Sequence, residues 1–228
     1  MPIRAIAFDL DDTLMDTTGI LVPRAAQNAF QILIDAGLNL TLDECEEKRT
    51  QMIKNVSHKD VFSTLAKDHG SEKTLLALDL ANKAFYEPEL PLQLPLLEGA
   101  RQNIDQLKKN YSLYVVTAGY ESAQKQKAKA LGIDQDFKKI FVVNSLQKER
   151  KLGSFEKILE LENIKPHELL CIGNSLSSEI KDAKKLGAVA CYFEFGEDRG
   201  PVSLNPAEKP DYHVKHHFDI IPTCKLKI

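Results

Sequence analysis

A chain of 228 residues with 43% hydrophobic and 28% charged residues has an ordinary globular composition and can bury a sizeable core. Its net charge of −3 gives no electrostatic case for nucleic acid or an anionic membrane, and no apolar stretch is long enough to cross a bilayer. The four cysteines include no Cys-x-x-Cys pair, which argues against a disulfide or zinc framework. With no leader pattern before the first apolar run, we expect a reduced, cytoplasmic protein.

The first predicted element is a short apolar strand that ends in acids. The run Ile3–Phe8 is followed by Asp9, Asp11 and Asp12, with Thr13 behind them. A run this apolar predicts a strand buried in a parallel sheet, whose carboxyl end opens into a ligand-binding crevice. In a strand-like geometry Asp9 and Asp11 point the same way, so they need a shared proton or a cation. The alternative is a loop that merely begins with acids, since Asp is a good turn residue.

Residues 17–91 carry helix signals and no strand pattern. Four helices are predicted, namely Val22–Ala36, two that begin at capping boxes on Thr41 and Ser57, and Ser71–Tyr86. The stretch Pro88–Pro95 contains three prolines and predicts a hinge back to the main sheet. We expect this insertion to form a cap over the carboxyl end of the sheet. A helical subdomain packed elsewhere is the alternative.

The second half of the chain alternates between strand and helix patterns. Predicted strands are Tyr111–Thr117, Ile140–Val143, Leu169–Ile172, Ala188–Phe193 and Tyr212–Val214; predicted helices are Glu121–Leu131, Ser154–Glu162 and Ser178–Leu186. This rhythm implies right-handed crossovers and a parallel sheet. The predicted fold is therefore α/β, a Rossmann-like parallel sheet flanked by helices. Residues 1–16 and 92–228 form its core, and residues 17–91 form an inserted helical-bundle cap domain.

Four motifs in order resemble the haloacid dehalogenase-like superfamily of phosphotransferases, in its subgroup with a helical cap after the first motif. They are Asp9-x-Asp11-x-Thr13, the apolar strand that ends at Thr117 with Ala118 and Gly119 behind it, a lysine before a helix, and Gly173-Asn174 followed at the family's spacing by Glu179. The resemblance spans nearly the whole chain. Its specificity comes from the order and separation of the motifs around a helical insertion.

The resemblance implies the catalytic roles. Asp9 attacks phosphorus to give an aspartyl-phosphate, and Asp11 protonates the leaving alkoxide and then takes a proton from water. The proton affinity of Asp11 is therefore expected to exceed that of Asp9. Mg²⁺, which prefers hard oxygen ligands, is expected on Asp9, the main-chain carbonyl of Asp11 and the side-chain oxygen of Asn174.

Other residues are implied to bind phosphate or to support the site. Thr117, Ala118 and a lysine are expected to hold the phosphoryl oxygens, Thr13 is expected to support the site, and Glu179 is expected to orient the waters bound to the metal. We prefer Lys151 to Lys148 as that lysine, because Lys151 lies nearer the predicted helix start.

The fourth motif departs from the family, because Asn174 stands where the pattern has its first Asp and Glu179 where it has its second. An amide oxygen can bind Mg²⁺ but brings no charge, so we expect a weaker metal site. Two interpretations follow, a working enzyme with weak metal affinity or a catalytically lapsed regulatory or binding protein. We favour the enzyme, because a lapsed protein has no chemical need for Asp11 beside Asp9.

The predicted function is a Mg²⁺-dependent phosphatase that hydrolyses a small phosphorylated metabolite, with neither nucleic acid nor membrane as partner. A phosphomutase of the same family is an alternative, whereas a dehalogenase is disfavoured, because halide displacement needs no acid such as Asp11. Oligomeric state and substrate are left open. Two polar groups are predicted to be solvated surface, the histidines His213, His216 and His217 and the lysines Lys125, Lys127 and Lys129. Asp12 and Asp16 are assigned no catalytic role.

Overall fold

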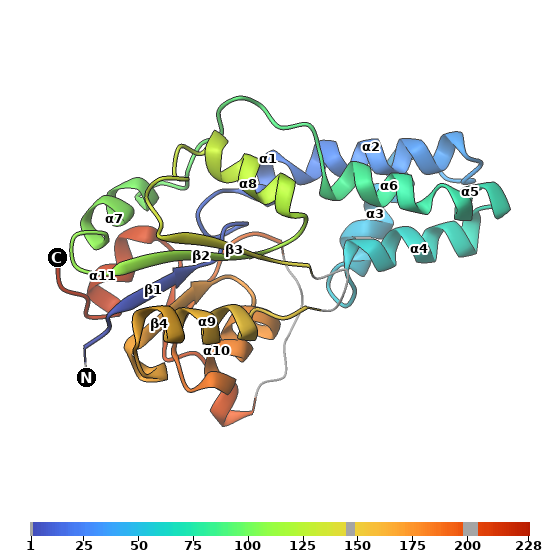
Figure 1. Cartoon of the computed structure of the whole chain (residues 1–228). Helices are drawn as coiled ribbons and strands as arrows, with labels where there is room; N and C mark the ends of the chain where they lie inside the picture. The colour runs from blue at the N-terminus through green and yellow to red at the C-terminus, as the bar shows by residue number, and fades with distance from the viewer. Residues whose placement is uncertain (1, 145–148, 198–204) are drawn as a thin grey trace. The chain divides into compact units, whose positions relative to one another are not determined.

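The structure is a computed structural model that describes residues 2–144, 149–197 and 205–228. In these residues six strands form one sheet in the order β3-β2-β1-β4-β5-β6 (Figure 1). The strands are β1 (Ala5–Phe8), β2 (Ser112–Ala118), β3 (Lys139–Val143), β4 (Leu169–Gly173), β5 (Val189–Phe193) and β6 (Tyr212–Val214). Every neighbouring pair is parallel. The predicted α/β fold with a Rossmann-like parallel sheet is confirmed.

Strand β1 lies in the middle of the sheet, between β2 and β4, and all four of its residues are buried. An entirely apolar run suits this position, because a strand covered on both faces has no side for polar residues. The register places Phe8 beside Val115 on one side and Ile172 on the other. The residues that follow these three emerge at one edge, at the point where the strand order reverses. That edge is where open α/β sheets bind ligands.

Helices cover both faces of the sheet. Figure 1 shows α9 and α10 on one face and α8 on the other. Phe155 and Ile158 of α9 pack with Ala7 and Cys171 of the sheet, whereas Phe8 meets Phe137 edge to face at 6.3 Å. The helices of this core unit are α7 (Ala100–Leu107), α8 (Glu121–Ala130), α9 (Leu152–Glu162), α10 (Lys181–Leu186) and α11 (Ile220–Thr223), with the short turns η2 (Pro166–Glu168), η3 (Leu176–Ile180, a π-helix), η4 (Pro206–Glu208) and η5 (His217–Asp219).

A second compact unit, here called the helical unit, comprises Thr18–Glu89 and Glu197 among the described residues, and the core unit comprises the rest. Its helices are α2 (Val22–Asp35), α3 (Leu42–Met52), α4 (His58–His69), α5 (Glu72–Leu76) and α6 (Leu78–Tyr86), with the turn α1 (Thr17–Ile20) at the junction. Phe62 packs edge to face on Phe30 and Phe85, with ring centroids 5.2 and 5.3 Å away, at the centre of this unit. The predicted capping boxes at Thr41 and Ser57 are confirmed.

The predicted single helix Ser71–Tyr86 is wrong, because the structure divides it into α5 and α6 at Ala77. The ψ angle of Ala77 is −6°, outside the usual helical range. The buried hydroxyl of Thr74 donates to the carbonyl of Ala36 at 3.0 Å and thereby fixes α5 against the end of α2. This local anchor accounts for a separate orientation of the short helix.

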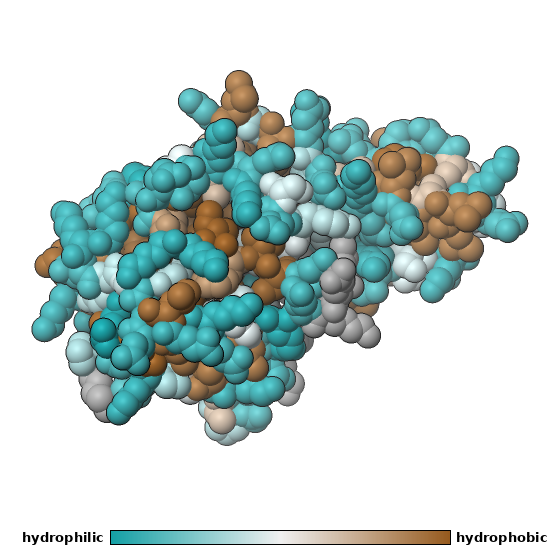
Figure 2. Space-filling view, viewed as in Figure 1, coloured by the Kyte–Doolittle hydropathy of each residue, from teal (hydrophilic) through white to brown (hydrophobic). Residues whose placement is uncertain are grey.

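Most of the surface in Figure 2 is hydrophilic, with apolar side chains gathered over the region of α5 and α6. In these helices Leu75, Leu76 and Leu80 are exposed. Exposed leucines are common on soluble domains and need no special explanation. Within the described residues, no helix combines the length and apolarity required to span a membrane.

Candidate active site

Asp9 is the first residue after β1, and the backbone holds it firmly. Its N–H donates to the carbonyl of Ile172 at 2.8 Å, and its Oδ1 accepts from the N–H of Leu10 at 2.8 Å. The strand ends at Phe8, and the chain then turns, with Asp12 at a φ of 53°. Asp11 therefore lies on a turn beyond the strand. The prediction that these acids follow a buried strand is confirmed.

The carboxylate of Asp9 shares one buried lysine with Glu179. Lys151 Nζ lies 2.8 Å from Asp9 Oδ1 and 2.9 Å from Glu179 Oε2, and all three side chains are less than 10% exposed. Burial raises the pKa of Asp9 to about 7 and the charge of Glu179 adds to this, although Lys151 acts in the opposite direction. Burial disfavours the charged form of Lys151, but the two carboxylates outweigh it and raise its pKa. Two acids on one lysine leave the ionised cluster with a net negative charge, which favours a further cation.

Glu179 reaches this cluster because Gly173 has no side chain. A Cβ placed on Gly173 would lie 2.4 Å from Glu179 Cγ, far inside van der Waals contact. The other carboxylate oxygen of Glu179 accepts from the N–H of Ser175. The π-helix Leu176–Ile180 thus turns Glu179 back toward the end of β4.

Asn174 lies at the end of β4, the strand paired with β1. Its Nδ2 donates to the carbonyl of Phe195 at 3.1 Å, which fixes the orientation of the amide. The carboxylate of Asp9, the carbonyl of Asp11 and the amide oxygen of Asn174 are hard oxygen donors of the kind that Mg²⁺ prefers. Across the part of the chain that the structure describes, no three His, Cys, Asp or Glu side chains gather as a metal site. These donors therefore fit a cation that relies on neutral oxygens and water as well as on Asp9.

Asp11 has its own lysine. Its Oδ1 accepts from Lys127 Nζ and from Thr17 Oγ1, both at 2.6 Å, and its Oδ2 accepts from Gln124 Nε2 at 2.9 Å. The prediction that Lys127 is solvated is wrong, because α8 buries the face that carries it, whereas Lys125 is exposed and pairs with Glu121. The spacing of 124, 127 and 131 along one helix face is the sequence signal that identifies this contact.

In this structure the pKa of Asp9 is higher than that of Asp11, which is the reverse of the predicted order. Burial acts to raise the pKa of Asp11, but the charge of Lys127 and hydrogen bonds from Lys127, Thr17 and Gln124 outweigh burial and lower it. Asp9 shares its lysine with a second acid, so its pKa stays raised. A divalent cation bound to Asp9 stabilises that carboxylate and moves the order toward the predicted one.

Two buried threonine hydroxyl groups of the motifs have no hydrogen-bond partner among the residues that the structure describes. They are Thr117 Oγ1 at the end of β2 and Thr13 Oγ1 behind Asp11, and both residues are fully buried. Buried polar groups are normally satisfied, so orphaned hydroxyls need an explanation. An oxygen-rich ligand at this edge would supply a partner for Thr117. Lys148, the alternative to Lys151, lies outside the described residues.

His217 is a support of the site that sequence reasoning missed. The prediction that the three histidines are solvated is confirmed for His213 and His216, which are exposed. It is wrong for His217, which is 1% exposed. Its Nε2 lies 2.7 Å from the carbonyl of Thr13, and Phe193 packs on its ring at 4.9 Å. Because the contact joins residues far apart in the chain, no local pattern reveals it.

We expect His217 to make folding stability depend on pH. Burial lowers its pKa to about 4, despite the opposing hydrogen bond to Thr13. An unfolded histidine, with a pKa near 6.5, binds a proton first, so stability is lost as the pH falls from about 6.5 toward 4. This group alone should cost the protein about 2 kcal/mol between pH 7 and pH 4.5. Denaturant unfolding at both pH values should show a smaller loss in His217→Gln; equal losses would contradict the assignment.

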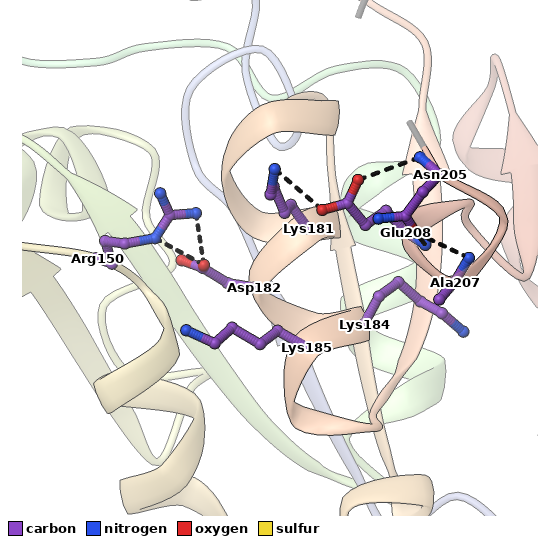
Figure 3. A pocket seen from close by; sticks show the side chains of 8 residues that line it. All are labelled: Arg150, Lys181, Asp182, Lys184, Lys185, Asn205, Ala207 and Glu208. Carbon is purple, nitrogen blue, oxygen red and sulfur yellow. Dashed lines mark hydrogen bonds and ion pairs between the residues drawn. The ribbon is translucent and has the colours of Figure 1, made fainter. Parts of the chain in front are cut away.

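A separate hollow of about 390 Å³ contains none of the candidate site residues. It is lined by Arg150, Lys181, Asp182, Lys184, Lys185, Asn205, Ala207 and Glu208 (Figure 3). Arg150 pairs with Asp182 at 2.6 Å and Lys181 pairs with Glu208 at 3.0 Å, as the dashed lines show. Much of its positive charge is therefore neutralised within the wall.

Comparisons with known proteins show which chains resemble this one. Glyceraldehyde 3-phosphate phosphatase of Methanothermobacter thermautotrophicus is 29% identical over 191 residues, which cover 82% of this chain and 84% of that one. YfnB of Bacillus subtilis, named as a HAD-hydrolase, is 26% identical over 98% of this chain and 91% of its own. A crystal structure of YfnB bound to magnesium superposes with a TM-score of 0.71 at 22% identity, covering 100% of both chains.

The family model for haloacid dehalogenase-like hydrolases matches residues 6–192. This range contains Asp9, Asp11 and the lysines that hold them, together with Thr18–Glu89 of the helical unit. Since the match covers most of the chain and every candidate site residue, the protein belongs to the haloacid dehalogenase-like hydrolases.

Proposed function

We propose that this hydrolase is a Mg²⁺-dependent phosphatase that hydrolyses a small phosphorylated metabolite through an aspartyl-phosphate on Asp9. The observation that carries the proposal is the pair of carboxylates with separate environments. Asp9 shares Lys151 with Glu179 at 2.8 and 2.9 Å, and Asp11 has Lys127 at 2.6 Å. Two carboxyl groups with different surroundings suit the different roles of nucleophile and acid–base catalyst.

In the first step an oxygen of Asp9 forms a bond to phosphorus, and the bond from phosphorus to the ester oxygen breaks. Asp11 gives its proton to that leaving oxygen, and the negative charge of a bound phosphate would act to raise the pKa of Asp11 against the effect of Lys127. In the second step Asp11 takes a proton from water, whose oxygen attacks phosphorus and releases Asp9 and inorganic phosphate. Mg²⁺ held by Asp9, the carbonyl of Asp11 and Asn174 would screen the negative charge of the phosphoryl group.

The remaining predicted residues have matching proposed roles. Lys151 offsets the charge of the phosphoryl oxygens, and Thr117 and the N–H of Ala118 donate to them. The unpartnered hydroxyl of Thr117 supports its role, because a phosphoryl oxygen would satisfy it. Glu179 holds Lys151 in place from the opposite side at 2.9 Å.

We propose that residues 17–91 act as a cap that selects the substrate, and that the protein works in the cytoplasm. The chain leaves the core unit at Thr17, whose own hydroxyl binds Asp11 at 2.6 Å. The chain therefore enters the helical unit directly after a residue that contacts the proposed acid–base carboxylate.

The first experiment measures release of p-nitrophenol from p-nitrophenyl phosphate by the purified protein, with Mg²⁺ and with EDTA. We expect turnover that requires Mg²⁺. A screen of small phosphate esters then follows, and it begins with glyceraldehyde 3-phosphate because the name of one relative specifies that substrate. No phosphate release from any ester, with retained ligand binding, would support the lapsed-enzyme alternative. Isomerised sugar phosphate without free phosphate would support the mutase.

Asn174→Asp tests the departure from the family pattern. The added carboxylate should lower the Mg²⁺ concentration for half-maximal activity by roughly tenfold, the scale of one modest charge-assisted contact. Repulsion from Asp9, Glu179 and the carbonyl of Phe195, which Nδ2 now contacts at 3.1 Å, limits the gain. Maximal activity at saturating Mg²⁺ should change much less. A Mg²⁺ titration of both proteins measures this, and an unchanged or greater requirement would show that residue 174 does not face the cation.

A further inference from the structure

Helix α8 buries two polar side chains that both bind Asp11. Gln124 is 4% exposed and Lys127 is 6% exposed, whereas their neighbours Lys125 and Gln126 are exposed. Lys127 Nζ lies 2.6 Å from Asp11 Oδ1, and Gln124 Nε2 lies 2.9 Å from Asp11 Oδ2. A buried ammonium group is costly unless a carboxylate compensates it, and Asp11 does so here.

We propose that Lys127 and Gln124 are positioning residues that hold Asp11 in the orientation required for acid–base catalysis. The inference rests on the proposed phosphatase function and extends the site to a helix that none of the four motifs includes. Asp11 stands on a turn beyond β1 and its side chain is 27% exposed, so packing alone does not restrict its rotamers. Donors on both carboxylate oxygens restrict them. Misplacement of a catalytic group by about 1 Å can cost roughly 100-fold in rate.

Gln124 also ties Asp11 to the phosphate-binding end of β2. The same Nε2 donates to the carbonyl of Ala118 at 2.9 Å, so one amide joins the acid–base residue to a residue proposed to bind the phosphoryl group. Both contacts require the amide nitrogen on this side, while Gln124 Oε1 is buried and has no partner within the described part of the chain. A Cβ on Gly119, at a φ of +144°, would lie 2.7 Å from Nε2. Glycine at position 119 therefore allows this close approach.

Removal of Lys127 or Gln124 should have different effects if their contacts with Asp11 only stabilise the fold and if they position Asp11 for catalysis. Loss of a structural pair lowers stability and impairs all substrates alike. Loss of positioning impairs the step that needs the proton, so an alkyl phosphate with a poor leaving group should suffer more than p-nitrophenyl phosphate. Loss of the positioning contact should also have little effect in a protein that already lacks Asp11, because the effects of substitutions at coupled residues are not additive.

The experiment compares Lys127→Met with Lys125→Met, a control on the same helix whose exposed lysine pairs only with exposed Glu121 among the contacts of the described residues. For Lys127→Met we expect kcat/KM on glycerol phosphate, which reports formation of the phosphoenzyme, to fall roughly 30- to 100-fold, with a smaller loss of kcat/KM on p-nitrophenyl phosphate. The control should match the wild type. In an Asp11→Asn background, Lys127→Met should add less than about threefold. Thermal unfolding verifies that each variant is folded.

If Lys127→Met fails to fold, Gln124→Leu removes one neutral donor and allows the same comparison, with a loss of roughly tenfold expected. Equal losses of kcat/KM on both esters, full additivity with Asp11→Asn, or kcat/KM equal to that of Lys125→Met would overturn the inference while leaving the phosphatase function intact. Absence of turnover in the wild-type protein on every ester would overturn both proposals.

Discussion

Asp9→Asn should fold normally and lose phosphatase turnover, by at least about 10³-fold in kcat. The amide cannot form the aspartyl-phosphate and removes one charge from the metal ligands. The fold should tolerate the change, because Lys151 keeps Glu179 at 2.9 Å. The free energy of unfolding in EDTA at pH 8 should not fall, since burial disfavours the ionised form of Asp9, whose pKa is raised to about 7.

The measurement is steady-state release of phosphate, alongside denaturant unfolding with EDTA. The matched control is Asp12→Asn, which changes an acid of the same loop that has no assigned catalytic role. Turnover in clean Asp9→Asn protein close to the wild-type rate would refute the nucleophile assignment.

Asp11→Asn should be almost as damaging, but the loss should depend on the leaving group. Protonation of an alkoxide needs the acid, whereas p-nitrophenolate leaves with little help, so alkyl phosphates should lose roughly 10²- to 10⁴-fold in kcat. With p-nitrophenyl phosphate the intermediate should still form, while its hydrolysis lacks a base. Phosphoenzyme should therefore accumulate.

Acid quench and intact-protein mass spectrometry would detect this phosphoenzyme, and a burst of p-nitrophenol before the steady state should accompany it. The same loss on both ester classes, with no trapped intermediate, would assign Asp11 a structural role instead. Asn at position 11 keeps the size of the side chain, so Thr17 and Lys127 retain an oxygen to bind.

The sequence predicts the sheet well because local chemistry alone specifies its strands. The run Ile3–Phe8 is apolar except for Arg4, and its last four residues, Ala5–Phe8, form the central strand β1. The family resemblance also singles out Lys151, which directly precedes α9 and which the structure places 2.8 Å from Asp9 Oδ1. These features depend on runs of adjacent residues and on the edge at which parallel strands end.

The burial of the residues that sequence analysis missed depends on which helix face packs against the sheet and on contacts between distant parts of the chain. Lys127 resembles its solvated neighbours in composition, and only the buried face of α8 distinguishes it. His217 lies among polar residues, and its environment comes from Phe193 and Thr13. The split of the last helix of the helical unit at Ala77 reflects a contact between Thr74 and Ala36 that no helix propensity encodes.

The hydrogen bond between His217 and Thr13 has a consequence for biosynthesis. Its two residues are separated by 204 positions, and the carbonyl belongs to the loop that carries Asp11. A ribosome makes the chain from the amino end, so Thr13 is synthesised 204 residues before His217. The nascent chain therefore cannot form this hydrogen bond until residue 217 has left the exit tunnel. Premature termination before residue 217 would yield a sheet with most of its strands, in which Asp9 and Leu14 can still bind Ile172 and Leu97 through the backbone but the carbonyl of Thr13 has lost His217.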